Sequence, residues 1–145
     1  MAIHQIIAVA LSVVFVCLSI LHIYWGLGGR AWIDAAIPEI DGKPAFQPSA
    51  LATFAVAIGL ALCAAVVADA AGLFPMPLLR SAGRWLIRAL SAVLFLRAIG
   101  DFRLVGFFKR ARRTRFARLD TAVYSPLCLV LAIGCAYISV AVSAD

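Results

Sequence analysis

Four apolar stretches, each long enough to cross a membrane as a helix, dominate this sequence. We expect the spans at residues 5–27, 49–73, 82–102 and 121–143. A helix of about 20 residues crosses a hydrocarbon core of about 30 Å. The runs are continuously apolar instead of alternating, which favours helices over a β-barrel. The sequence therefore predicts an all-α, polytopic membrane protein, a four-transmembrane-helix bundle that forms a single domain over residues 1–145.

The composition argues against most soluble classes of protein. Of the 145 residues, 65% are hydrophobic and 14% are charged, whereas ordinary soluble proteins are about 45–50% apolar and about 25% charged. A chain this short cannot hide the excess in its interior, because small domains bury a lower fraction of their surface. The surplus apolar side chains must face lipid. This disfavours a soluble enzyme, a disordered chain and a secreted disulfide scaffold.

Basic side chains gather in the connection between the third and fourth spans. Seven of them lie there: Arg103, Lys109, Arg110, Arg112, Arg113, Arg115 and Arg118. The first connection adds Arg30 and Lys43, and in a four-span protein both connections lie on the same side. Basic residues near the ends of spans stay in the cytoplasm. We therefore expect a multi-pass protein with both termini outside and these two connections in the cytoplasm.

The third connection also shows helical spacing of its apolar residues. Leu104, Phe107, Phe108 and Ala111 follow the i, i+3, i+4, i+7 pattern of an amphipathic helix. A short interfacial helix and a prolongation of the third span both fit this pattern. Basic residues here would meet anionic lipid headgroups on the cytoplasmic face, each contributing about 1 kcal/mol. The predicted headgroup contacts are Lys109, Arg110, Arg112, Arg113 and Arg115. Topology accounts for the basic run, so we expect no nucleic acid partner.

Polar residues from the spans are expected at one common depth, the cytoplasmic end. Ionisable groups inside a membrane are costly, so each needs a partner or a purpose. Arg97 and Asp101 are spaced i, i+4 and are expected to pair, either as a structural ion pair or to hold Arg97 for an anionic ligand. Tyr24 and Trp25 also fit interfacial anchors, and Asp120 also fits a helix cap. The candidate ligand-binding pocket consists of His22, Tyr24, Trp25, Arg97, Asp101, Asp120 and Tyr124.

At the opposite end, one acidic residue is expected to face two basic ones. Asp69 lies near the end of the second span, and Arg84 and Arg88 lie at the start of the third. A structural ion pair explains all three residues.

The sequence predicts neither a metal centre nor a cofactor. The two histidines, His4 and His22, lie about 27 Å apart along one helix, so they cannot ligate the same metal or haem. The four cysteines lie within spans and form no C-x-x-C pair, which indicates packing residues rather than a redox centre.

The second span is rich in small residues at four-residue spacing. The pairs are Ala55/Gly59, Ala57/Ala61 and Ala61/Ala65. Such rows let helix backbones approach closely. They fit packing within the bundle, and they also fit contact with a second copy or with a larger membrane complex.

Three segments resemble a known family. They are HIYWGLGG (residues 22–29), LRAIGDFRLVGFFKR (residues 96–110) and TRFARLDTAVYSPLCL (residues 114–129). They are similar to a family of bacterial four-helix membrane proteins catalogued as a domain of unknown function. The resemblance covers nearly the whole chain. It implies a multi-pass protein of the bacterial cytoplasmic (inner) membrane with no assigned activity, and it supplies no catalytic residues.

Three functions remain open from the sequence. The first is a binding or transport module, with Arg97 as the contact for a small anion or a lipid headgroup. The second is a structural or assembly subunit of a larger membrane complex. The third is a membrane-interface enzyme in which His22 acts as general acid or base and Asp101 orients it.

Overall fold

The computed structural model describes residues 1–40, 43–76 and 82–142 of a predominantly helical chain. Four long helices carry the fold: α1 (Ile3–Gly26), α3 (Ala50–Ala70), α4 (Gly83–Ile99) and α6 (Ser125–Ala141). Short elements lie in the connections: α2 (Ile33–Ala36), the paired strands β1 (Glu39–Ile40) and β2 (Lys43–Pro44), α5 (Arg115–Leu119) and the π-helical turn η2 (Asp120–Tyr124).

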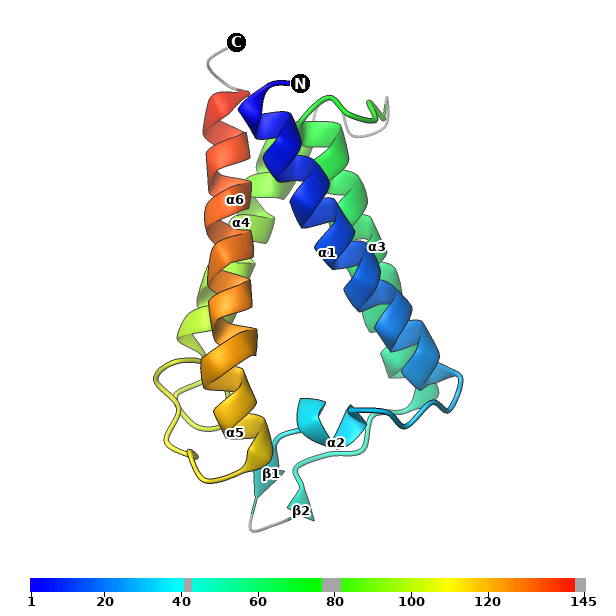
Figure 1. Cartoon of the computed structure of the whole chain (residues 1–145), viewed down its shortest axis with the longest axis vertical. Helices are drawn as coiled ribbons and strands as arrows, with labels where there is room; N and C mark the ends of the chain where they lie inside the picture. Colours follow the sequence, from blue (N-terminus) through cyan, green and yellow to red (C-terminus); the bar gives the residue numbers. More distant parts are fainter. Residues whose placement is uncertain (41–42, 77–81, 143–145) are drawn as a thin grey trace.

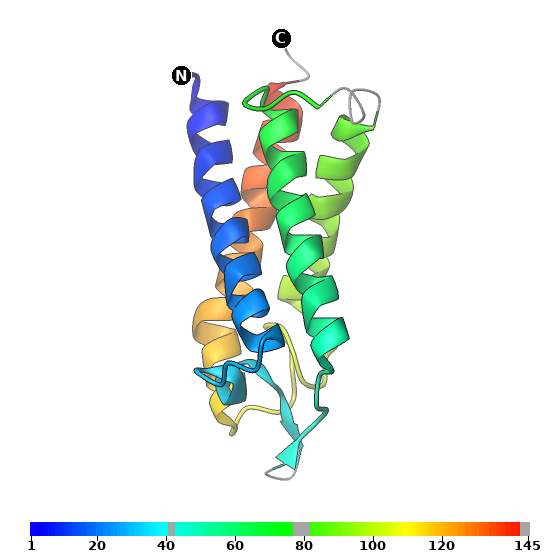
Figure 2. The ribbon, with the colours of Figure 1, turned by 90° about the vertical axis from the view of Figure 1, so that its right-hand side faces the viewer.

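The long helices form two antiparallel pairs, α1 with α3 and α4 with α6 (Figure 1). The pairs pack together at the end where α1 begins and α6 ends, and they diverge toward the other end, where α2, the two strands and α5 lie (Figures 1 and 2). The buried core that joins them is apolar and includes Phe15, Val67, Ile87, Leu131 and Ile138. The start of α1 and the end of α6 therefore share one end of the molecule.

Serine hydroxyls tie each helix to its antiparallel partner. Ser19 Oγ donates to the Ala57 carbonyl at 2.7 Å, which links α1 to α3. Ser91 Oγ donates to the Ala132 carbonyl at 2.8 Å, which links α4 to α6. Where lipid replaces water there is little hydrophobic drive between helices, so close packing and such interhelical hydrogen bonds hold the pairs together.

Within the described residues, three helical segments are long and apolar enough to cross a membrane. They are Ile3–Gly26, Ala50–Ala70 and Arg115–Ala141, the last running through α5, η2 and α6. Helix α4 has 17 residues, about 25 Å of helix, and carries Arg84, Arg88 and Arg97. The expected all-α fold is confirmed, and these three segments have the length and composition expected of membrane spans.

Two helix ends differ from the expected limits of the spans. The third helix ends at Ile99 rather than near residue 102, because Gly100 leaves the helix with a φ of 95° that a side chain would resist. The last helical segment begins at Arg115 rather than near residue 121, because the Thr114 hydroxyl caps it by accepting a hydrogen bond from Ala117 N at 3.1 Å.

The third connection is an irregular loop, so both helical interpretations of residues 104–113 were wrong. The backbone turns back at Gly106, where φ is 90°, and Phe107 N donates to the Ala98 carbonyl at 2.9 Å. A Cβ on either Gly100 or Gly106 would overlap the other's segment of backbone. This close backbone contact, which only glycine permits, replaces the amphipathic helix. We call residues 100–114 the basic loop.

Candidate functional site

A buried carboxylate, Asp120, holds the basic loop against η2. Asp120 is fully buried. Its Oδ1 accepts from Arg97 Nη2 at 2.9 Å, and its Oδ2 accepts from Lys109 Nζ at 2.9 Å and from Gly106 N at 2.7 Å. Arg97 comes from α4 and Lys109 from the basic loop. One carboxylate therefore joins three segments of the chain.

Lys109 is buried as deeply as its partner, with 2% of its surface exposed. Its ammonium has three N–H donors, and three acceptors receive them: Asp120 Oδ2, the Gly106 carbonyl at 2.9 Å and Thr121 Oγ1 at 2.6 Å. Thr121 is free to accept because its own hydroxyl donates to the Ala117 carbonyl at 3.1 Å. The buried cation is fully satisfied.

A second carboxylate, Asp101, shapes the opposite arm of the basic loop. Its Oδ1 accepts from the amides of Arg103, Leu104 and Val105 at 2.9, 2.7 and 3.0 Å. Desolvation by burial acts to raise the pKa of the Asp101 carboxyl, but these hydrogen bonds outweigh it and lower the pKa below its usual value. Asp101 is thus a loop cap.

These contacts correct two predictions. Arg97 does not pair with Asp101 four residues away; it pairs with Asp120, 23 residues away. Lys109 is not exposed for contact with lipid headgroups, because it is buried against Asp120. In both cases a contact that is distant in sequence replaced one inferred from local spacing.

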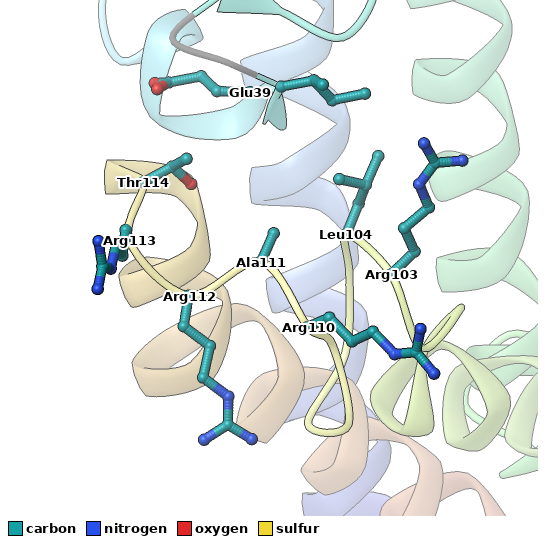
Figure 3. A pocket seen from close by; sticks show the side chains of 9 residues that line it. Glu39, Arg103, Leu104, Arg110, Ala111, Arg112, Arg113 and Thr114 are labelled. Carbon is teal, nitrogen blue, oxygen red and sulfur yellow. The ribbon is translucent and has the colours of Figure 1, made fainter.

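The other basic residues of the loop surround a cavity of about 530 Å³ (Figure 3). Arg103 and Arg110 extend to one side of the loop, Arg113 extends to the other, and Arg112 points in a third direction (Figure 3). Glu39 of β1 lines the same cavity (Figure 3). Arg110, Arg112 and Arg113 were predicted headgroup contacts, and they lie here together. Arg115 is exposed at the start of α5, beside but outside this lining.

A second, largely apolar cavity of about 250 Å³ lies where α1 ends and α3 begins. Its walls are His22, Trp25, Ile33, Ala36, Ile37, Phe46, Pro48, Ala52, Thr53 and Val56. His22 Nδ1 bonds to the Leu18 carbonyl of its own helix at 2.8 Å, and Trp25 Nε1 donates to the Ala31 carbonyl at 2.8 Å. We call this space the His22 cavity.

The predicted pocket is therefore divided between separate places. His22 and Trp25 line the His22 cavity, whereas Arg97 and Asp120 lie in the buried cluster. The other two aromatic residues bond to the backbone: Tyr24 Oη accepts from Ala31 N at 3.4 Å, and Tyr124 Oη donates to the Ala35 carbonyl at 3.0 Å.

The catalytic pairing of His22 with Asp101 has no support in the geometry. His22 bonds to Leu18, and Asp101 bonds to three loop amides. Among the residues that the structure describes, no hydrogen bond joins the two side chains, and no group of three or more His, Cys, Asp or Glu is placed to hold a metal ion.

At the opposite end of the described part of the molecule, Asp69 does not form the predicted ion pair with Arg84 and Arg88. Asp69 Oδ1 accepts from Met76 N at 2.6 Å, and no salt bridge joins it to Arg84 or Arg88 in residues 1–40, 43–76 and 82–142. Arg88 instead lies 5.5 Å from the centroid of the Trp85 ring. Asp69 thus fixes the turn that ends α3.

Sequence reasoning did not assign Arg103, Glu39 or the ion pair of Lys109 to a site. The excess of basic residues pointed to the loop, but only its backward turn at Gly106 brings Lys109 to Asp120. A glycine at each end of the segment GDFRLVG (residues 100–106) was the available signal for that turn.

The chain matches one family model, described as "Protein of unknown function (DUF3995)", over residues 15–135. The chain belongs to this family. The DUF3995 match contains the His22 cavity, the basic loop and the Asp120 cluster, and it confirms the resemblance to a family of unknown function. No curated protein and no solved structure matches the chain.

Proposed function

We propose that this DUF3995 member is a four-span protein of the bacterial cytoplasmic membrane that binds anionic lipid headgroups through its basic loop. In this proposal α4 is the remaining span, paired with α6 throughout its length, and both termini lie outside. The basic loop then faces the cytoplasm, in agreement with the preference of arginine and lysine for that side.

The observation that carries the proposal is the gathering of four arginines around one cavity. Arg103, Arg110, Arg112 and Arg113 all line it. Their side chains spread to both sides of the loop instead of converging on one point (Figure 3). A spread of guanidinium groups suits several phosphates of a lipid surface better than one small anion, and arginine binds phosphate with two parallel hydrogen bonds.

The Asp120 cluster supports this role because it fixes the loop. Lys109 and Gly106 anchor one part of the loop to η2, and Asp101 caps another part. A binding surface whose backbone is already ordered loses less entropy when it meets its ligand.

The test is binding of phosphatidylglycerol and phosphatidylcholine to purified protein, measured by native mass spectrometry. We compare the double variant Arg103→Gln/Arg110→Gln with Arg30→Gln/Lys43→Gln, which removes two exposed charges from the same end but outside the cavity. Two lost headgroup contacts at about 1 kcal/mol each weaken phosphatidylglycerol binding about 30-fold. The proposal fails if both doubles lose affinity equally, or if phosphatidylcholine binds as well.

The orientation is tested with single cysteines in a background without Cys17, Cys63, Cys128 and Cys135. Cysteines at Lys43 and Arg112 should resist membrane-impermeant maleimide in intact cells, and a cysteine at Ala2 should react. Reaction at Lys43 or Arg112 without lysis reverses the proposed topology.

A structural or assembly subunit is the second candidate, favoured by the outer face of α3. Ala55 and Gly59 are exposed on this face, four residues apart, and a Cβ at Gly59 would meet no atom within 4 Å. A small-residue face allows a helix of another protein, or of a second copy, to approach closely. Crosslinking through a cysteine at Gly59 in native membranes tests this candidate; no crosslinked species would count against it.

A further inference from the structure

We infer that the His22 cavity is a binding site for a lipid-soluble compound with a hydroxyl group, such as a phenol, which donates a hydrogen bond to His22 Nε2. This site is separate from the basic loop and does not depend on lipid headgroup binding there. The inference rests on the size of the cavity and on the hydrogen-bonding state of each polar group that lines it.

The lining is apolar apart from three side chains. Seven of its side chains consist only of carbon and hydrogen: those of Ile33, Ala36, Ile37, Phe46, Pro48, Ala52 and Val56. The volume of about 250 Å³ lies just below the roughly 300 Å³ at which drug-sized pockets begin. The cavity thus fits one or two fused rings, with Phe46 and Trp25 as aromatic neighbours. A strongly hydrated or charged ligand would lose its hydration in this cavity and find too few hydrogen bonds to replace it.

The polar side chains of the lining provide acceptors and no spare donor. Trp25 Nε1 already donates to the Ala31 carbonyl, and the Thr53 hydroxyl already donates its proton to the Ser49 carbonyl at 3.0 Å. His22 Nδ1 faces the Leu18 carbonyl, which can only accept, so the proton of the neutral ring is on Nδ1.

The neutral ring then presents a lone pair at Nε2, which forms no hydrogen bond within the described part of the chain. His22 and Thr53 both line the cavity, and His22 Nε2 and Thr53 Oγ1 are the side-chain acceptors there that receive no hydrogen bond from the described residues. A ligand that satisfies them must carry a donor, and a donor on a ring-sized apolar body is a phenol or a similar alcohol. A ketone, an ether or a carboxylate would place an acceptor against an acceptor.

The experiment uses ¹⁵N-histidine-labelled protein in detergent, whose spectrum contains only His4 and His22. Before addition, His22 should show a protonated Nδ1 and a pyridine-like Nε2. 2-Naphthol is the probe, and 2-methoxynaphthalene is its matched control, which has nearly the same shape and no donor. We expect the His22 Nε2 resonance to move saturably with 2-naphthol and to remain in place with 2-methoxynaphthalene, while His4 moves with neither.

Three outcomes would overturn the inference. The first is a protonated Nε2 in the unliganded protein, because it would make the ring a donor into the cavity. The second is no shift at His22 at saturating 2-naphthol. The third is an equal shift with both probes, which would indicate apolar filling, as by an acyl chain. Val56→Phe places a larger side chain in the cavity from α3 and leaves His22 unchanged. This variant should abolish the shift of the His22 Nε2 resonance with 2-naphthol. A shift that persists in the folded variant would mean that the probe binds elsewhere.

Discussion

Asp120→Asn is the substitution that most directly tests how the basic loop is held. It keeps the shape of the side chain and removes the negative charge that two cations share. Arg97 can recover solvation, because about one third of its side chain is exposed, whereas Lys109 cannot, because its side chain is 1% exposed. The cost therefore falls mainly on Lys109.

The magnitude follows from this difference in burial. Removing one partner of a buried ion pair costs about 3–5 kcal/mol, because the remaining charge is uncompensated. Lys109 retains the Gly106 carbonyl and Thr121 Oγ1 as acceptors. We therefore expect Asp120→Asn to lower the free energy of unfolding by about 3 kcal/mol, at the lower end of that range.

A double-mutant cycle with Lys109→Met separates the charge effect from packing. Lys109→Met leaves Asp120 with Arg97 and the Gly106 amide, so it should cost about 1–3 kcal/mol, the penalty for a lost buried hydrogen-bond partner. In the double variant no lysine charge is stranded, so it should be more stable than Asp120→Asn alone. The assay is unfolding in a titration of SDS into mild detergent, followed by tryptophan fluorescence.

Asp34→Asn is the control, because Asp34 is an exposed carboxylate in α2, and surface substitutions usually stay within about 0.5 kcal/mol. The reasoning is refuted if Asp120→Asn unfolds like Asp34→Asn. It is also refuted if adding Lys109→Met makes Asp120→Asn still less stable, since a stranded ammonium would then not be the cause.

The remaining predictions concern the other supports of the basic loop. Asp101→Asn should lower the thermal unfolding temperature at neutral pH, and the difference from wild type should disappear in acid. The pKa of Asp101 in the folded protein lies below the ordinary value of 3.8. The carboxylate therefore contributes fully to stability above pH 3.8, and this contribution is lost as the pH falls through the folded-state pKa. A gap that does not change with pH would mean that the Asp101 charge is not what stabilises the loop. Gly106→Ala should destabilise the protein by more than about 1 kcal/mol, since it adds a Cβ at a φ of 90° against the Gly100 backbone, while Gly59→Ala, in a helix with open space around it, should be neutral or slightly stabilising. Equal unfolding temperatures for these two variants would contradict the close approach at Gly106.

The helices could be predicted from the sequence because hydrophobicity acts locally. Each long apolar run has to form its own backbone hydrogen bonds in lipid, whatever the rest of the chain does. The basic loop could not be predicted in the same way. Its apolar spacing fits a helix, but Gly100 and Gly106 allow a backbone contact that helical spacing does not reveal. The backbone contact between two turns, and not the local spacing of apolar residues, therefore determines the structure of this segment.

The predicted ion pair of Arg97 with Asp101 was wrong for a related reason. The pairing of Arg97 with Asp101 followed from the i, i+4 rule, which assumes that the helix continues to Asp101. The helix ends at Ile99, so Asp101 turns to its own loop amides and Arg97 is left for Asp120. An error of a few residues at a helix end therefore exchanged the partners of two charged groups.

The choice of cations in the basic loop now has a physical explanation. Lys109 is the one lysine among the loop's basic residues, and it is the one that is buried. An ammonium is compact and donates in three directions, which matches the three acceptors around it, whereas a planar guanidinium with five donors would leave some of them unsatisfied there. The arginines stay at the surface, where a planar, bidentate cation is the better partner for phosphate. Asp120 holds Lys109 in the interior, so the cations that the loop exposes are its four arginines.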